Sequence, residues 1–206
     1  IVAYYGESPS WFTNLGDDTH GEDFKKPLTI YKNFERYQLN RIFGDKENLA
    51  VHSQQRMFRA CQSLIEEMRK RPNINGYVVT EFTDIEWETN GWLDYTRDMK
   101  ADFEKASNFN GPLVVMADGV NRNMWSGDKQ AWDVIISNHN QEELNGILEW
   151  EIMNTEINGQ LEIEEGNSLQ VKLSEVIQFT APTVGKSCFY KLQLRIRRDG
   201  KIVAWN

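Results

Sequence analysis

The chain has 206 residues, 40% of them hydrophobic, which suffices for one large domain or two small ones with a packed core. Its net charge of −8 at pH 7 argues against nucleic acid as a partner, because phosphate binding requires a basic face. The sequence has no apolar run of membrane-spanning length, so we expect no membrane partner.

The first 70 or so residues combine strand and helix patterns. Residues 1–5 are an apolar run that predicts a short buried strand. Residues 7–26 are rich in Gly, Asp, Ser and Thr, which predicts a long functional or mobile loop. Apolar residues at helical spacing predict a helix over 27–43 and a longer one over 46–71, which Pro72 ends.

The segment after Pro72 carries the strongest indication of function. Residues 77–79 are a short apolar run that predicts a buried strand. Acids and indoles follow it directly: Glu81, Asp84, Glu86, Trp87, Glu88 and Trp92. Carboxylates bond hydroxyls or transfer protons, and flat aromatic faces pack against the C–H faces of sugar rings. The segment therefore indicates a carbohydrate site; the alternative is an acidic, solvated loop after a core strand.

After residues 108–112 the sequence shows alternating, strand-like stretches separated by turn signals. The predicted strands are residues 113–116, 132–136, 147–152, 161–163, 169–179, 189–196 and 202–205. The turn signals are Asn-Gly at 145–146 and 158–159, Gly-Asn at 166–167 and Asp-Gly at 199–200. About seven short strands over this length predict an immunoglobulin-like sandwich.

Cysteine and histidine give no sign of a metal centre or a cofactor. Cys61 and Cys188 lie far apart in sequence, and we favour two reduced core thiols over a single disulfide. His20, His52 and His139 are too scattered to form a ligand set. We therefore predict no metal and no cofactor.

Several segments of the first half carry a family resemblance. They are FERYQL at 34–39, IFG at 42–44, IEEMRKRP at 65–72 and GYVVTEFTD at 76–84, followed by Trp87-Glu88 and Asn90-Gly91. These segments resemble glycoside hydrolase family 2, in particular β-galactosidase and β-glucuronidase relatives. The resemblance implies that residues 1–109 are the last quarter of a (β/α)8 catalytic barrel. The expected fold class is thus an α/β segment followed by an all-β immunoglobulin-like sandwich over residues 110–206.

The resemblance implies hydrolysis of terminal O-glycosidic bonds with retention, which uses two glutamates about 5 Å apart. The family's acid/base lies in an upstream region that this chain does not contain. Its nucleophile lies in a Ser-Glu-Phe-Gly type motif, whose closest match here is Ala3-Tyr4-Tyr5-Gly6. Tyr4 then stands where the glutamate belongs, and Glu7 follows three residues later. Either Glu7 takes part or the nucleophile is lost, so we expect the chain alone to be inactive.

By analogy with the rim of a barrel, Glu81 joins Glu7 as a catalytic candidate. For Glu81 the alternative is a structural pair with a neighbouring cation. The candidates for substrate binding are Trp11, Asp84, Glu86 and Trp87. For Trp87 the alternative is core packing beneath the loop.

The expected partners are a carbohydrate substrate and either the remainder of the barrel or another copy of the chain. The main rival function is a non-catalytic carbohydrate-binding or structural fragment; a third is assembly through the edge strands of the sandwich. The first residues lack the features of a signal peptide. We expect the chain to derive from a longer or processed parent, periplasmic or secreted in a bacterium.

Overall fold

The computed structural model describes residues 28–85, 89–94, 96–140, 142–166 and 168–206. The chain divides into two compact units. The first unit comprises Ile1–Leu64 and Gly76–Ala106, and the second comprises Ile65–Asn75 and Ser107–Asn206. None of the described helices is both long and apolar enough to cross a membrane.

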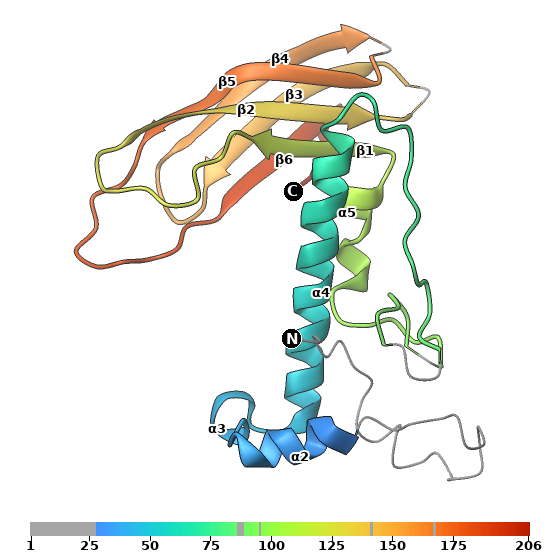
Figure 1. Cartoon of the computed structure of the whole chain (residues 1–206). Coiled ribbons are helices and arrows are strands. Elements are labelled where there is room, and N and C mark those ends of the chain that lie inside the picture. The colour runs from blue at the N-terminus through green and yellow to red at the C-terminus, as the bar shows by residue number, and fades with distance from the viewer. Residues whose placement is uncertain (1–27, 86–88, 95, 141, 167) are drawn as a thin grey trace. The chain divides into compact units, whose positions relative to one another are not determined.

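Three helices open the described part of the chain (Figure 1). They are α2 (Leu28–Arg36), α3 (Asn40–Phe43) and α4 (Lys46–Arg69). Asp45 caps α4, because its carboxylate accepts the N–H of Asn48 at 2.8 Å. The long helix predicted over 46–71 is therefore confirmed, two residues shorter at its end.

In the first unit, α4 buries Ala50, Met57 and Phe58. Phe58 packs against Trp92 with ring centroids 5.7 Å apart, and Phe103 packs edge-on against both rings at 6.3 Å. Phe103 begins the short 3-10 helix η2 (Phe103–Lys105). Trp92 is the residue by which the segment after α4 contributes to this aromatic cluster.

The predicted fold class is wrong. The described part of the chain is mostly antiparallel sheet, and residues 77–80, expected to be a buried strand of an α/β barrel, form no strand. Val78 in the middle of this run is 90% exposed. A parallel strand inside an α/β fold is covered on both faces, which this segment is not.

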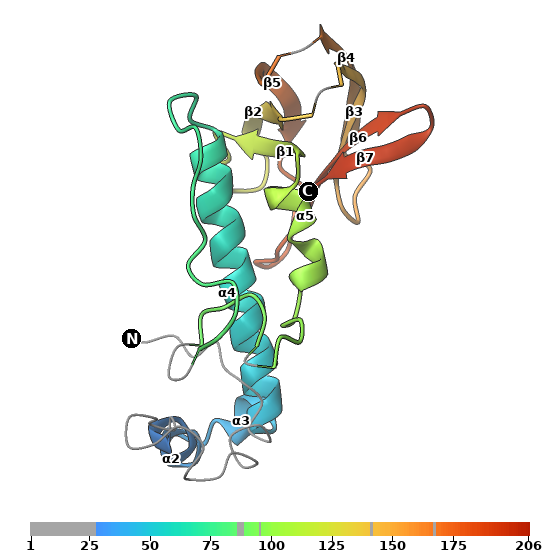
Figure 2. The ribbon, with the colours of Figure 1, turned by 90° about the vertical axis from the view of Figure 1, so that its right-hand side faces the viewer.

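The second unit holds seven strands in its described residues, arranged as two antiparallel sheets (Figure 2). One sheet has the order β1-β2-β5 and the other the order β4-β3-β6-β7. The strands are β1 (Leu113–Asp118), β2 (Lys129–Asn138), β3 (Leu144–Ile152), β4 (Asn158–Gly166), β5 (Gln170–Thr180), β6 (Leu192–Arg198) and β7 (Lys201–Trp205). Each predicted stretch of alternation overlaps one of them.

Alternate residues of both sheets meet in one apolar core, so the sheets form a sandwich. Val115, Val134 and Ile136 come from the first sheet, and Leu148 and Ile196 from the second. All five are fully shielded from solvent or nearly so. The short helix α5 (Ser107–Asn110) precedes β1.

The outer face of the first sheet is also covered. Val114, Met116 and Ile135 point away from the sandwich core and are still buried. The last turn of α4 is fastened here by Arg69, whose side chain donates to the Ser137 hydroxyl at 3.4 Å and whose carbonyl accepts the side chain of Gln170 at 2.6 Å. The end of α4 therefore belongs to the second unit.

Two of the predicted turns lie inside strands instead. Gly146 is in β3, and a Cβ there would come within 2.5 Å of the Arg197 carbonyl oxygen on β6. Gly159 is in β4, and a Cβ there would meet the Trp150 indole at 2.7 Å. Glycine is required at these two positions because the Arg197 carbonyl and the Trp150 indole lie too close for a side chain, and not because the chain turns there. The predicted turn at Asp199-Gly200 is confirmed, because both residues have positive φ between β6 and β7.

Candidate functional site

The candidate site predicted from the sequence lies in the first unit, on the segment of residues 80–100, named here the 80–100 loop. Its centre is an ion pair between Asp84 and Lys100, with both side chains buried. The Lys100 ammonium lies 2.7 and 2.8 Å from the two carboxylate oxygens and donates to the Thr89 carbonyl at 2.9 Å. Two of these contacts are hydrogen bonds, to Asp84 Oδ1 and to the Thr89 carbonyl, and the contact with Asp84 Oδ2 is an ion pair without a hydrogen bond.

Backbone contacts close the loop around this pair. The Asp84 N–H donates to the Leu93 carbonyl at 3.1 Å, and the Leu93 N–H donates to the Phe82 carbonyl at 2.9 Å. The Gly91 N–H donates to the Asp84 carboxylate at 2.7 Å. A Cβ on Gly91 would lie 2.4 Å from the Asp84 nitrogen, so only glycine allows the two segments to approach this closely.

The loop is anchored at both ends. The Asn90 side chain donates to the Thr80 carbonyl at 3.2 Å and so ties the start of the loop to its middle. Beyond Lys100, the Ala101 N–H donates to the Gln54 side chain on α4 at 3.0 Å. Trp92, between these points, is buried in the aromatic cluster with Phe58 and Phe103. The described parts of the loop, residues 80–85, 89–94 and 96–100, are thus held together by hydrogen bonds, an ion pair and the burial of Trp92.

Four of the predicted site residues fall on this loop, and the structure describes two of them, which have different environments. The Glu81 side chain is half-buried. Asp84 is buried and engaged by Lys100, so its expected role in substrate binding has no support from its position. The remaining candidates, Glu7, Trp11, Glu86 and Trp87, lie outside the described residues, as does Tyr4.

Sequence reasoning missed Lys100. It lies sixteen positions after Asp84, too far along the sequence for a local helix or strand pattern to connect the two residues. The nearby Asp94, Asp98 and Arg97 make it look like one charge among several on a solvated turn. The only available signal was the position of a lysine after Met99 in a segment that also holds the core residue Trp92.

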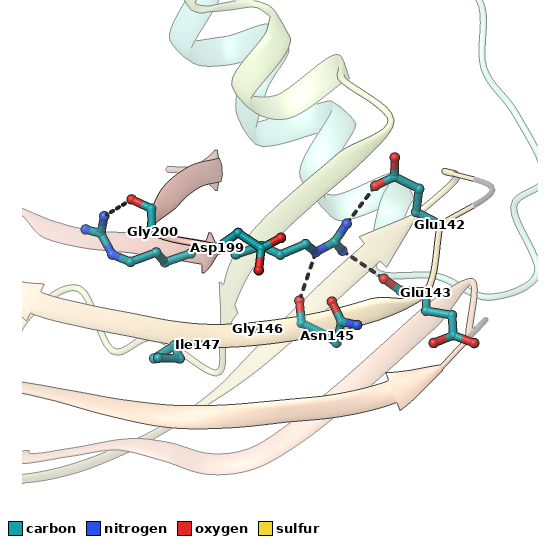
Figure 3. Close-up of a pocket in the computed structure, with 9 residues that line it drawn as sticks. Glu142, Glu143, Asn145, Gly146, Ile147, Asp199 and Gly200 are labelled. Atoms are coloured by element: carbon teal, nitrogen blue, oxygen red, sulfur yellow. Dashed lines mark hydrogen bonds and ion pairs between the residues drawn. The ribbon is translucent and has the colours of Figure 1, made fainter.

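In the second unit, a shallow pocket of about 580 Å³ lies beside the start of β3 and the turn between β6 and β7 (Figure 3). Arg198 donates to the Glu142 carboxylate at 2.6 Å and to the Glu143 carbonyl at 2.8 Å. Arg197 donates to the Gly200 carbonyl at 3.1 Å. Protein oxygens engage both guanidinium groups, and we assign this pocket no ligand.

The same sheet carries cross-strand ion pairs on its outer face. Arg197 binds both carboxylate oxygens of Glu149 at 3.0 and 3.2 Å, and these hydrogen bonds lower the pKa of Glu149 and raise that of Arg197. Arg195 pairs with Glu151 one step along the strands. Such pairs align neighbouring strands and are typical of a solvated sheet face.

Among the residues that the structure describes, no group of three or more His, Cys, Asp or Glu side chains is arranged to hold a metal ion. Within the same residues, Cys61 and Cys188 form no disulfide. No model of a known protein family matches this sequence, and no curated protein is significantly similar to it.

Proposed function

We propose that this chain is part of a retaining β-glycosidase that hydrolyses terminal O-glycosidic bonds of carbohydrates, with the 80–100 loop contacting the sugar. The observation that carries the proposal is how the loop is held: the buried Asp84–Lys100 pair fixes the backbone three positions from the half-buried Glu81. Proton transfer and the binding of hydroxyls both require a carboxylate on a fixed backbone, because small misplacements cost large factors in rate. The proposal also rests on the resemblance to family 2 glycosidases that we infer from the sequence of residues 76–84 and 90–91.

Retention requires a second carboxylate about 5 Å from the first. Asp84 does not suit that role, because Lys100 engages both of its oxygens. We expect the second carboxylate to come from Glu7 or from outside this chain. We therefore expect the purified chain to bind sugars but not to turn over aryl β-glycosides.

A non-catalytic carbohydrate-binding or structural role is the second candidate. The ion pair at Asp84 favours it, because that pair is a structural device and removes one predicted acid from the binding set. In this alternative the loop serves only to cover the aromatic cluster, and Glu81 has no part in binding.

A titration with sugar lactones tests the proposal, because their flattened rings resemble the oxocarbenium-like transition state of glycoside hydrolysis. We expect saturable binding of galactonolactone or glucarolactone by calorimetry. Glu81→Gln should weaken it about tenfold, the cost of one charge-assisted hydrogen bond. Glu104→Gln, at an exposed glutamate of η2, is the matched control and should bind as the unmodified chain does. Equal affinities for the two variants would overturn the assignment of Glu81.

A further inference from the structure

Two loops of the second unit leave the same end of the sandwich, residues 119–128 between β1 and β2 and residues 181–191 between β5 and β6 (Figure 1). They are named here the aromatic loop surface. Backbone bonds join them: the Gly127 N–H donates to the Ala181 carbonyl at 3.0 Å, and the Ala181 N–H donates to the Asp128 carbonyl at 2.8 Å. The two loops therefore form one structure.

Trp125 stands out on this surface because its side chain is 85% exposed. Its backbone is fixed by Asp128, whose carboxylate accepts the Trp125 N–H at 2.8 Å and whose own N–H donates to the Trp125 carbonyl at 3.1 Å. The next residue, Ser126, accepts the Val184 N–H from the second loop at 3.1 Å. A rigid turn thus holds a large apolar ring in water, an arrangement typical of a binding surface.

The second loop adds further rings. Phe189 is fully exposed, and Tyr190 is 45% exposed. Both follow Cys188, whose side-chain hydrogen bond with Tyr190 raises the pKa of that tyrosine. The surface therefore offers three exposed or partly exposed aromatic side chains.

The charges of the two loops are opposite to the charge of the whole chain. The loops contain three cations, Arg122, Lys186 and Lys191, and one carboxylate, Asp128, which is already engaged by the Trp125 backbone. The chain as a whole carries −8. A cationic surface on an acidic protein is complementary to an anionic ligand.

We propose that the aromatic loop surface binds an acidic polysaccharide. The Trp125 indole packs against the C–H face of a sugar ring, and Arg122 and Lys186 pair with carboxylates of the uronic acid units. The carbohydrate class of this ligand rests on the proposed function, whereas its negative charge follows from the loops alone.

Calorimetry with two oligosaccharides of equal length tests this site. A β-1,4-linked hexamannuronate is the acidic probe and cellohexaose the neutral one. We expect the intact chain to bind the acidic probe more tightly, with an affinity that falls as salt rises. Trp125→Ala should weaken binding about tenfold, and Trp125→Phe should restore most of it. Arg122→Gln with Lys186→Gln should weaken binding and flatten the salt dependence, whereas Lys201→Gln, at an exposed lysine of β7, should change neither.

Equal affinity for the two oligosaccharides would overturn the acidic ligand. No binding of either one, or unchanged binding by Trp125→Ala, would overturn the site. Tighter binding of a DNA oligonucleotide would show a general polyanion surface and also overturn the assignment. The glycosidase proposal is tested separately, by the binding of monosaccharide lactones and its weakening in Glu81→Gln. Either proposal can therefore fail without the other. Thermal unfolding of each variant checks that the fold is intact, as expected for substitutions at exposed positions.

Discussion

Lys100 and Asp84 form an ion pair excluded from solvent, with side chains 0% and 2% exposed. The pair joins Asp84, near the start of the 80–100 loop, to the last residue of the loop, and the Lys100 ammonium also donates to the Thr89 carbonyl. Burying two charges is costly, and the cost is offset only while both partners are present. The main effect of the pair is therefore to specify one conformation of the loop, and its net contribution to the free energy of unfolding is small.

Lys100→Met should destabilise the chain by about 3–5 kcal/mol, because it leaves the Asp84 carboxylate buried without its cation. Urea unfolding followed by tryptophan fluorescence measures the loss. Lys105→Met is the control: it breaks the Lys105–Asp102 pair, in which the lysine is about half exposed, and should cost about 1 kcal/mol or less. Similar losses in the two variants would show that the Asp84–Lys100 pair is not critical.

Gly159→Ala should destabilise the second unit by about 1–3 kcal/mol, because its Cβ would overlap the Trp150 indole at 2.7 Å. Near-ultraviolet circular dichroism should change as the indole shifts. Gly185→Ala is the matched control, since a Cβ there meets nothing within 4 Å. A Gly159→Ala variant as stable as Gly185→Ala would contradict the close packing of β4 on β3.

The Glu149–Arg197 pair should make stability depend on pH at the acidic end. Because the folded pKa of Glu149 lies below its ordinary value of 4.5, the pair's contribution is present above that pH and is lost as pH falls through the folded pKa. Glu149→Gln should flatten the loss of unfolding free energy below about pH 4.5. Glu162→Gln, at an exposed glutamate of β4, should follow the unmodified chain. Parallel curves for all three proteins would contradict the assignment.

Residues 110–206 expressed alone should unfold cooperatively, because the sandwich core comes entirely from strands within them. The fragment loses the last turn of α4, which Arg69 ties to Ser137 on β2, and we expect this loss to expose the outer-face residues Val114, Met116 and Ile135. We therefore expect it to bind a hydrophobic dye and to self-associate. A fragment that unfolds without cooperativity would show that the sandwich needs residues before position 110.

The strands of the sandwich could be predicted because alternation reports directly which side chains face a core. Residues 77–79 misled for the converse reason: a short apolar run matches a buried strand in composition, yet Val78 lies in water. The Asn-Gly pairs at 145–146 and 158–159 led to incorrect turn predictions, because glycine occurs both in turns and where another segment packs closely against the backbone. Only the neighbours Arg197 and Trp150, which the sequence does not reveal, show that these two glycines allow close packing.

The candidate site was predicted only in part. Composition placed Glu81 and Asp84 on one loop, but their different environments depend on a tertiary contact. Lys100 converts Asp84 from a candidate ligand into a structural group, and a distant lysine gives no local pattern. The burial of the outer face of the first sheet was not predicted for the same reason. Arg69 contacts Ser137 and Gln170, which are far from it in the sequence, so no local pattern indicates these contacts.

The most direct test of the glycosidase proposal is hydrogen–deuterium exchange of the intact chain with and without a saturating sugar lactone. Sugar bound at Glu81 should protect the amides of the 80–100 loop and leave those of β3 and β6 unchanged. Protection should disappear in Glu81→Gln and persist in Glu104→Gln. Unchanged exchange in residues 80–93 with lactone bound elsewhere would contradict the assignment of this loop to the sugar.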